Sequence, residues 1–246
     1  MKVDTLNATD GTLTGWNCQT CKNRGYVAVI DEGGETFHTV ACRDCVTKRA
    51  CILKMEKSGL RDVIKNYTFD KFIADTPWRT RMKTVAEEYA NAPDGKWLAF
   101  CGQGGTGKTH LCTAVCRKFL LDNRQVVYMP WRDDVAIIKS YENADRDAKL
   151  LVAKNAEILY IDDFLKAGAA IDGTARPTGL ELAIAFEIIN FRYINRLVTV
   201  ISSEYTLGEI SDMDEAIGGR IAEMCDGNVI SVERDASKNY RLRGVV

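Results

Sequence analysis

Short apolar runs alternate with longer amphipathic stretches along most of this chain of 246 residues. The runs are rich in β-branched and aromatic side chains, which is typical of buried strands. The stretches between them repeat apolar residues at helical spacing, as Leu111, Ala114, Val115, Phe119 and Leu120 do. This alternation predicts an α/β fold in which helices cover a parallel sheet. The expected strands are residues 97–100, 125–131, 157–164, 197–203 and, more weakly, 228–233, and the expected helices are residues 110–123, 133–153 and 178–195.

The N-terminal part of the chain has a different pattern. Residues 25–41 (GYVAVIDEGGETFHTVA) favour strands, and the Gly-Gly pair at 33–34 predicts a β-hairpin. A Cys-x-x-Cys pair precedes the hairpin and a second one follows it, so four thiolates could complete a tetrahedral site, which suits zinc. Because such a module has a small core, the metal would supply most of its folding free energy. The candidate zinc ligands are Cys18, Cys21, Cys42 and Cys45.

Other interpretations of these cysteines are four free thiols or a redox-active Cys-x-x-Cys pair. His38 lies between the pairs and could also bind a metal, although an ordinary strand residue explains it as well. A site closed by four thiolates leaves no open position for chemistry, so the module is expected to bind a partner.

A glycine-rich loop follows the first expected strand. Residues 102–109 (GQGGTGKT) match G-x-x-x-x-G-K-[ST] between a strand and a helix, which is the context that this phosphate-binding motif requires. Glycines let main-chain N–H groups approach phosphate oxygens, Lys108 reaches the β- and γ-phosphates, and the Thr109 hydroxyl binds Mg²⁺. The sequence therefore predicts a site for ATP and Mg²⁺. Its candidate residues are Gly102, Gln103, Gly104, Gly105, Thr106, Gly107, Lys108 and Thr109.

Two acidic residues end another expected strand. Ligands of open α/β sheets bind at the carboxyl ends of the strands, where Asp162 and Asp163 are expected to lie. Asp162 is the candidate carboxylate of the magnesium site, and Asp163 is the candidate general base that polarises the attacking water. An acidic turn is the alternative, but the upstream loop favours the catalytic interpretation. We expect residues 1–60 to form the zinc-binding module with a helical linker, and residues 61–246 to form the ATPase domain.

Composition narrows the classes of function. The formal net charge is −1, so nucleic-acid binding would depend on a local basic patch. The chain has no apolar run of membrane-spanning length and its polar start is unlike a signal peptide, so we expect a cytoplasmic protein with no membrane partner. Nine cysteines in such a protein are not expected to form disulfides, and those outside the two pairs are expected to be buried thiols.

Several segments together resemble the AAA+ ATPases of the DnaC/DnaI helicase-loader type, to which IstB-like transposition helpers are closely related. The resemblance covers about residues 62–243, and the cysteine module is similar to the N-terminal zinc-binding domain of the DnaI type. The loop motif alone is shared by many families, whereas the combination of segments is specific. These segments are GQGGTGKTHL (102–111), YIDDF (160–164), FRYINRLVTVISSE (191–204) and GGRIAEM (218–224).

The resemblance implies further site residues. It places Phe69 near the adenine, although packing against the core explains an aromatic residue there equally well, and it adds His110 to the nucleotide-binding residues. Ser203 would orient the attacking water, with Glu204 at a position where the family usually has asparagine. Arg220 resembles an arginine finger that reaches the γ-phosphate of a neighbouring subunit, and a surface arginine is the alternative.

The function that this resemblance implies is an ATP-dependent loader of a replicative DNA helicase. It would bind ATP-Mg²⁺ and single-stranded DNA, self-associate on ATP binding and hydrolyse ATP slowly, as a switch. An IstB-like transposition helper is one alternative. A nucleotide-binding adaptor with little hydrolysis is another, favoured by Glu204.

Overall fold

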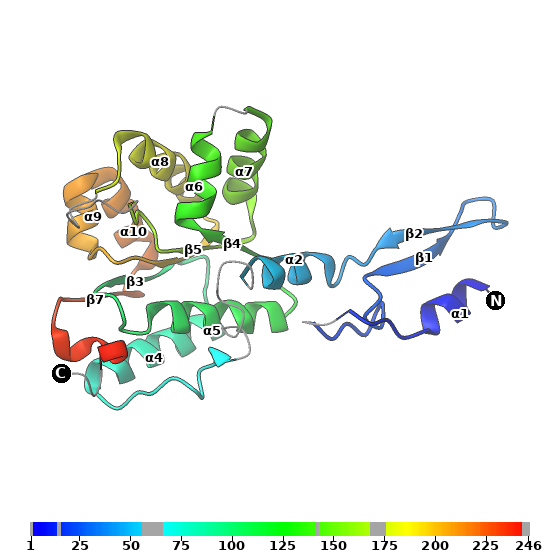
Figure 1. The fold of residues 1–246 in the computed structure, drawn as a ribbon, viewed down its shortest axis with the longest axis horizontal. Coiled ribbons are helices and arrows are strands. Elements are labelled where there is room, and N and C mark those ends of the chain that lie inside the picture. Colours follow the sequence, from blue (N-terminus) through cyan, green and yellow to red (C-terminus); the bar gives the residue numbers. More distant parts are fainter. Residues whose placement is uncertain (1, 14–15, 56–65, 141–142, 168–175, 243–246) are drawn as a thin grey trace. The chain divides into compact units, whose positions relative to one another are not determined.

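A computed structural model describes residues 2–13, 16–55, 66–140, 143–167 and 176–242 (Figure 1). The chain divides into two compact units, Met1–Arg61 and Asp62–Val246. The smaller unit packs around the paired cysteines together with Trp16 and Val27, whereas the larger unit has an extensive hydrophobic core. Each unit therefore has its own source of stability.

The smaller unit contains the predicted hairpin. Its strands are antiparallel, with Tyr26 opposite Ala41, and Gly34 takes a φ of 74° in the turn between them. The side-chain amide of Asn7 bonds both the N–H and the carbonyl oxygen of Ala28, at 2.9 Å each, so the first helix is fixed beside the hairpin. The elements are α1 (Lys2–Ala8), β1 (Tyr26–Ile30), β2 (Phe37–Ala41) and α2 (Val46–Met55).

The larger unit is built on a parallel sheet, which confirms the predicted fold class. Within the described residues the sheet has five strands in the order β4-β5-β6-β3-β7. All five lie within one or two residues of the expected positions. They are β3 (Leu98–Gly102), β4 (Val126–Pro130), β5 (Ile158–Asp162), β6 (Val198–Ser202) and β7 (Val229–Val232).

Helices cover both faces of this sheet (Figure 1). Helices α4 and α5 lie on one side, and α6 to α10 lie on the other. Alternate residues of β3 serve the two layers, since Ala99 and Cys101 belong to the core shared with α8 and α10. None of the described helices is long and apolar enough to cross a membrane. The helices are α4 (Pro77–Asn91), α5 (Lys108–Leu121), α6 (Trp131–Lys139), α7 (Asn143–Asn155), α8 (Gly179–Ile194), α9 (Leu207–Met213) and α10 (Glu215–Cys225), followed by the short 3₁₀ turns η2 (Ala236–Lys238) and η3 (Tyr240–Leu242).

One prediction about the helices is wrong. The single helix expected over residues 133–153 is two helices, α6 and α7. Helix α6 ends because Ser140 takes an extended conformation, with a ψ of 149°, and its hydroxyl donates to the carbonyl oxygen of Ile137. A serine side chain that bonds the backbone in this way competes with continuation of the helix.

A fully buried arginine joins the helical layer to the sheet. Arg192 of α8 donates from its guanidinium to the carbonyl oxygens of Ala153 and Ala156, at the end of α7, and of Val198, at the start of β6. Burial lowers the pKa of this guanidinium. The bonds satisfy carbonyl groups that the end of a helix leaves unpaired, and they place a positive charge where the helix dipole is negative.

Candidate nucleotide-binding site and thiol cluster

The ends of neighbouring strands form the candidate nucleotide site. Strand β6 lies between β5, which ends at Asp162, and β3, which leads into the glycine-rich loop. Ser202, the last residue of β6, is therefore placed between the candidate magnesium carboxylate and the loop. Because all these strands run in parallel, their carboxyl ends meet at one edge of the sheet, as the sequence predicts.

The glycines of the loop are needed for conformation and for space. Gly102, Gly105 and Gly107 have φ values of 94°, 76° and 96°, which side-chain-bearing residues rarely adopt. A Cβ atom at Gly102 would lie 2.1 Å from the Val232 carbonyl oxygen, and one at Gly107 would lie 2.6 Å from the Phe72 ring. The loop therefore packs closely against the backbone of Val232 and the ring of Phe72.

Lys108, the lysine of the motif, is buried at the start of α5. Its Nζ donates to the carbonyl oxygens of Gly102 and Gln103 at 2.7 and 2.6 Å, so the ammonium is held at the loop. Burial lowers the pKa of Lys108, while the nearby carboxylates of Glu204 and Asp163 raise it. A phosphate group would supply the negative charge that a buried ammonium group requires.

Asp162 is a buried carboxylate that accepts hydrogen bonds from hydroxyl groups. Thr109 Oγ1 lies 3.2 Å from Oδ1, and Tyr160 and Ser202 donate to the same oxygen at 2.8 and 2.5 Å. Tyr128 donates to Oδ2 at 3.0 Å. Hydroxyl donors stabilise the charged form of a buried carboxylate. The contact between Thr109 and Asp162 joins the two residues that the sequence assigns to magnesium.

Asp163 begins a turn directly after β5 and has a φ of 56°. Its carboxylate Oδ2 lies 2.9 Å from Lys166 Nζ, which also lies 3.0 Å from Glu204 Oε1. The N–H of Asp163 donates to Ser202 Oγ at 3.1 Å. The candidate general base is therefore partly exposed and paired with a lysine that the sequence had not indicated.

An aromatic cluster packs beside the loop. The ring of His110 stacks on Tyr67, with centroids 4.4 Å apart, and meets the ring of Phe72 edge to face. His110 Nε2 lies 2.9 Å from the Thr68 carbonyl oxygen, and burial lowers the pKa of this imidazole. Phe69, the residue expected near the adenine, is half-buried in the same segment. Its contact with the base stays a prediction.

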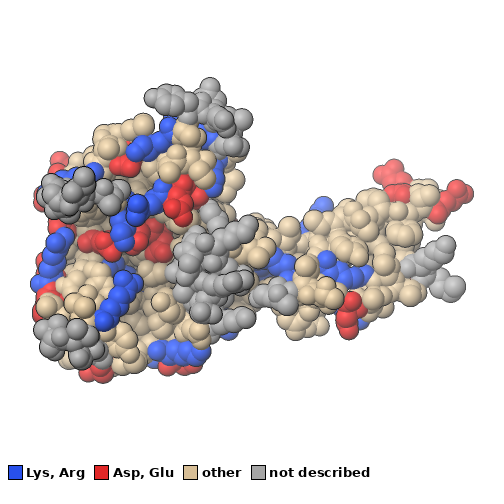
Figure 2. All heavy atoms as spheres, in the orientation of Figure 1, with Lys and Arg blue, Asp and Glu red and all other residues tan. Residues whose placement is uncertain are grey.

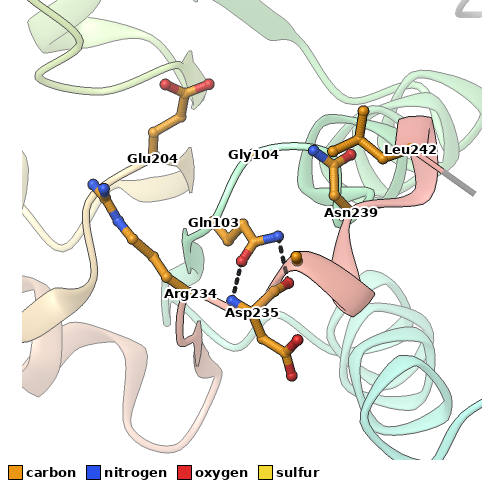
Figure 3. Close-up of a pocket in the computed structure, with 8 residues that line it drawn as sticks. Gln103, Gly104, Glu204, Arg234, Asp235, Asn239 and Leu242 are labelled. Carbon is orange, nitrogen blue, oxygen red and sulfur yellow. Dashed lines mark hydrogen bonds between the residues drawn. The ribbon is translucent and has the colours of Figure 1, made fainter. Parts of the chain in front are cut away.

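The segment after β7 packs on the loop from another side. The side-chain amide of Gln103 pairs with the backbone N–H and carbonyl of Asp235, and Tyr240 N–H donates to the Gly105 carbonyl at 2.9 Å. A pocket of about 540 Å³ lies between this segment, Glu204 and the loop. Figure 3 shows Gly104 among the residues that line the pocket, with Glu204 and Arg234 on one side of it in this view and Asn239 and Leu242 on the other.

Two predicted catalytic residues bond within the chain. The Ser203 hydroxyl donates to the Phe164 carbonyl at 2.8 Å and accepts from the N–H of Tyr205. Arg220 Nε donates to Asn190 at 3.0 Å, and its guanidinium lies over the Phe186 ring at 5.1 Å. Their roles toward water and toward a neighbouring subunit stay predictions.

Sequence reasoning missed the residues that support Asp162. Tyr160 could have been found, because it lies two positions before Asp162 in a strand and so shares its face. Tyr128 stands opposite Tyr160 in the register of β4 and β5. Its role, like that of Ser202, depends on the order of the strands, which the sequence does not state.

The four paired cysteines of the smaller unit form a compact cluster. Their sulfur atoms all lie within 4.8 Å of one another, with Cys18 and Cys42 3.7 Å apart and Cys21 and Cys45 3.6 Å apart. Four thiolates around zinc at about 2.3 Å give sulfur–sulfur distances of about 3.8 Å, so the cluster fits this metal. Although burial raises the pKa of Cys21, hydrogen bonds from the Gly25 N–H and the other thiols bring it to about 7.

Comparison with known proteins identifies the family. No family model matches the chain. The uncharacterized protein YqaM of Bacillus subtilis strain 168 is 31% identical over 231 residues, which cover 89% of this chain and 72% of YqaM. The replicative helicase loader DnaC of Escherichia coli strain K12 is 23% identical over 172 residues, 68% of this chain and 66% of DnaC. The chain belongs to the DnaC/DnaI type of AAA+ proteins.

Another sequence relative and two solved structures are also similar to this AAA+ protein. The phage-like element PBSX protein XkdC of Bacillus subtilis strain 168 is 29% identical over 94% of this chain and 88% of XkdC. The crystal structure of DnaI has the same fold, with a TM-score of 0.56 and 18% identity over 72% of this chain and 91% of DnaI. DnaA bound to AMPPCP and single-stranded DNA has a TM-score of 0.53 at 18% identity, over 72% of this chain and 54% of DnaA.

The hydroxyl donors of Asp162 can be tested by stability. We expect Tyr160→Phe to lower the free energy of unfolding by about 2 kcal/mol, because it removes a hydrogen bond to a charged group. Tyr89→Phe is the matched control, since the buried Tyr89 hydroxyl donates to the neutral Lys96 carbonyl, and it should cost about 1 kcal/mol. Urea unfolding followed by tryptophan fluorescence measures both values. A smaller loss at Tyr160 than at Tyr89 would contradict this account.

The thiol cluster predicts dependence on a metal. Purified protein should contain about one zinc ion per chain, measured by mass spectrometry, and a chelator should unfold the smaller unit while the larger unit keeps its structure. Cys42→Ser should lose the metal. Cys51→Ser, which alters a buried cysteine outside the cluster, should retain it. Full metal content in Cys42→Ser would show that the cluster is not the binding site.

Proposed function

We propose that this protein is an ATP-dependent loader of a replicative DNA helicase. The observation that carries the proposal is the contact between Thr109 and Asp162, 3.2 Å apart across the sheet edge, with the Lys108 ammonium held in the adjoining loop. A hydroxyl, a carboxylate and an ammonium in this arrangement provide what a triphosphate and its metal require.

Each residue has a separate role in the proposed ATPase. The Thr109 hydroxyl donates a hydrogen bond to Asp162 and keeps an oxygen lone pair for Mg²⁺, which would neutralise charge on the phosphates. The N–H groups of the loop and Lys108 bind the phosphate oxygens. Asp163 and Ser203 orient the attacking water, and Arg220 of one subunit reaches the γ-phosphate held by another. That last role requires Arg220 to leave Asn190, so it belongs to the assembled form.

Pairing of Asp163 with Lys166 favours slow hydrolysis. A carboxylate held by an ammonium group has to leave that ion pair before it can act on a water molecule. This supports a switch in which bound ATP holds one conformation and hydrolysis releases it. A nucleotide-binding adaptor with very little hydrolysis is the second candidate, and the same ion pair favours it.

The smaller unit supplies the proposed contact with the helicase. Its hairpin exposes apolar side chains, with Ile30 56% and Phe37 43% exposed. Exposed apolar groups on a small module held together by its thiol cluster fit a docking role. DnaC, one of the relatives, is itself named a replicative helicase loader.

Single-stranded DNA is the second proposed partner. The related DnaA structure contains both AMPPCP and single-stranded DNA. Figure 2 shows basic and acidic side chains interspersed on the visible face of the larger unit. We therefore expect DNA contacts to come from local basic groups that self-association brings together, rather than from one large patch.

ATP turnover tests the catalytic assignments. Lys108→Ala should abolish binding of ATP and hence turnover, whereas Asp163→Asn should keep ATP binding and lower turnover by about 100-fold. Asp122→Asn is the control, because Asp122 pairs with Lys118 at the far end of the same helix. Turnover by the Lys108→Ala variant equal to that of the unaltered protein would contradict the site.

Complex formation tests the partner. The protein should elute together with the replicative helicase on a sizing column when ATP is present, and substitution of Ile30 and Phe37 by serine should prevent this while leaving ATP turnover intact. Absence of a complex with either ATP or ADP would remove the main support for a loader. Capture of a transposase instead would favour the IstB-like alternative.

A further inference from the structure

Lys166 joins two carboxylates at the edge of the sheet that carries the loop. Its Nζ lies 2.9 Å from Asp163 Oδ2 and 3.0 Å from Glu204 Oε1. Asp163 directly follows β5, and Glu204 follows the neighbouring strand β6 by two residues. One ammonium group therefore neutralises acidic side chains from two adjacent strand ends.

The backbone around Lys166 is strained. Asp163 and Leu165 have φ values of 56° and 62°, in the left-handed region that favours glycine. Hydrogen bonds to Ser202 hold the turn, since the N–H of Asp163 donates to its hydroxyl and the N–H of Phe164 donates to its carbonyl, at 3.1 and 2.8 Å. Strain of this kind persists where surrounding contacts impose it, and it is concentrated at functional sites.

The carboxylates that Lys166 binds lie close to the glycine-rich loop. Glu204 Oε1 is 3.4 Å from the position that a Cβ of Gly104 would take, and Glu204 lines the pocket beside the loop (Figure 3). Glu204 and Asp163 also act on the Lys108 ammonium, whose pKa they raise against the effect of burial. Both carboxylates are thus near enough to repel the terminal phosphate of a triphosphate.

The charges at this edge need a cation. Asp162 is satisfied by hydroxyl groups, which leave its negative charge in place. Arg234 lines the pocket, and Lys108 is bonded to main-chain carbonyls. Lys166 is the residue whose ammonium is bonded to Asp163 and Glu204 together. Its removal would leave both carboxylates facing the phosphate chain.

We propose that Lys166 sets the preference of this site for ATP over ADP. By neutralising Asp163 and Glu204 it lets an acidic edge accept a γ-phosphate. ADP, which lacks that phosphate, depends on the loop and Lys108 and is less affected. The inference rests on the proposed binding of nucleotide at the loop. In it, Lys166 acts by neutralising the two carboxylates and takes no part in bond breaking.

Calorimetric titration with Mg²⁺ and either ADP or a non-hydrolysable ATP analogue tests this role. Lys166→Ala should weaken binding of the ATP analogue about tenfold and of ADP less than about threefold, because a charge close to the γ-phosphate is lost. Glu204→Gln in the Lys166→Ala background should restore most of the lost affinity, since it removes the negative charge that Lys166 balances. Glu204→Gln alone should bind the ATP analogue at least as tightly as the unaltered protein.

Lys149→Ala is a matched control. Lys149 lies on α7, and its side chain has the same 32% exposure as that of Lys166. Its Nζ lies 2.7 Å from Asp134 Oδ1. Lys149→Ala should leave the ratio of ATP to ADP affinity unchanged. Equal losses for the two nucleotides in Lys166→Ala, no loss, or no restoration by Glu204→Gln would overturn the inference while nucleotide binding stands. Absence of binding to either nucleotide by the unaltered protein would overturn the proposed function as well.

Discussion

The candidate nucleotide site at the edge of the sheet depends on one constraint, the buried negative charge of Asp162. A carboxylate out of water is costly unless donors surround it, and here the donors are hydroxyl groups from β4, β5, β6 and α5. The donors on β4, β6 and α5 reach Asp162 only in the observed strand order and register. A slip of one residue in β5 would turn Tyr160 and Asp162 to the opposite face. The hydrogen bonds that stabilise the Asp162 carboxylate therefore require this architecture of the sheet.

The glycine-rich loop shows a related dependence on distant parts of the chain. Its Gly105 carbonyl accepts from Tyr240, and its Gln103 side chain pairs with the backbone of Asp235. On another side, Phe72 packs where a side chain at Gly107 would lie. A loop made of glycine has little rigidity of its own. Segments before and after the sheet hold it in shape, so the cost of ordering it is met before a phosphate arrives.

Most of the fold could be predicted from the sequence, because hydrophobic periodicity and the loop motif are local signals. The strands, the hairpin and the helices expected over residues 110–123 and 178–195 follow from them. The break at Ser140 did not, since a serine inside a helical pattern gives no sign of which conformation it will adopt. At the site, Asp162 and Thr109 were evident from spacing. Tyr128 and Lys166 were not, because their roles depend on strand order and on a strained turn.

In the proposed ATPase, the charged groups near the γ-phosphate would also include the candidate general base. The carboxylate of Asp163, the proposed general base, is bonded to the ammonium group of Lys166. Because Lys166 also bonds Glu204, one ammonium group would hold both carboxylates while the γ-phosphate is bound. An ion pair that has to open before Asp163 can act on water fits the proposed switch better than a motor.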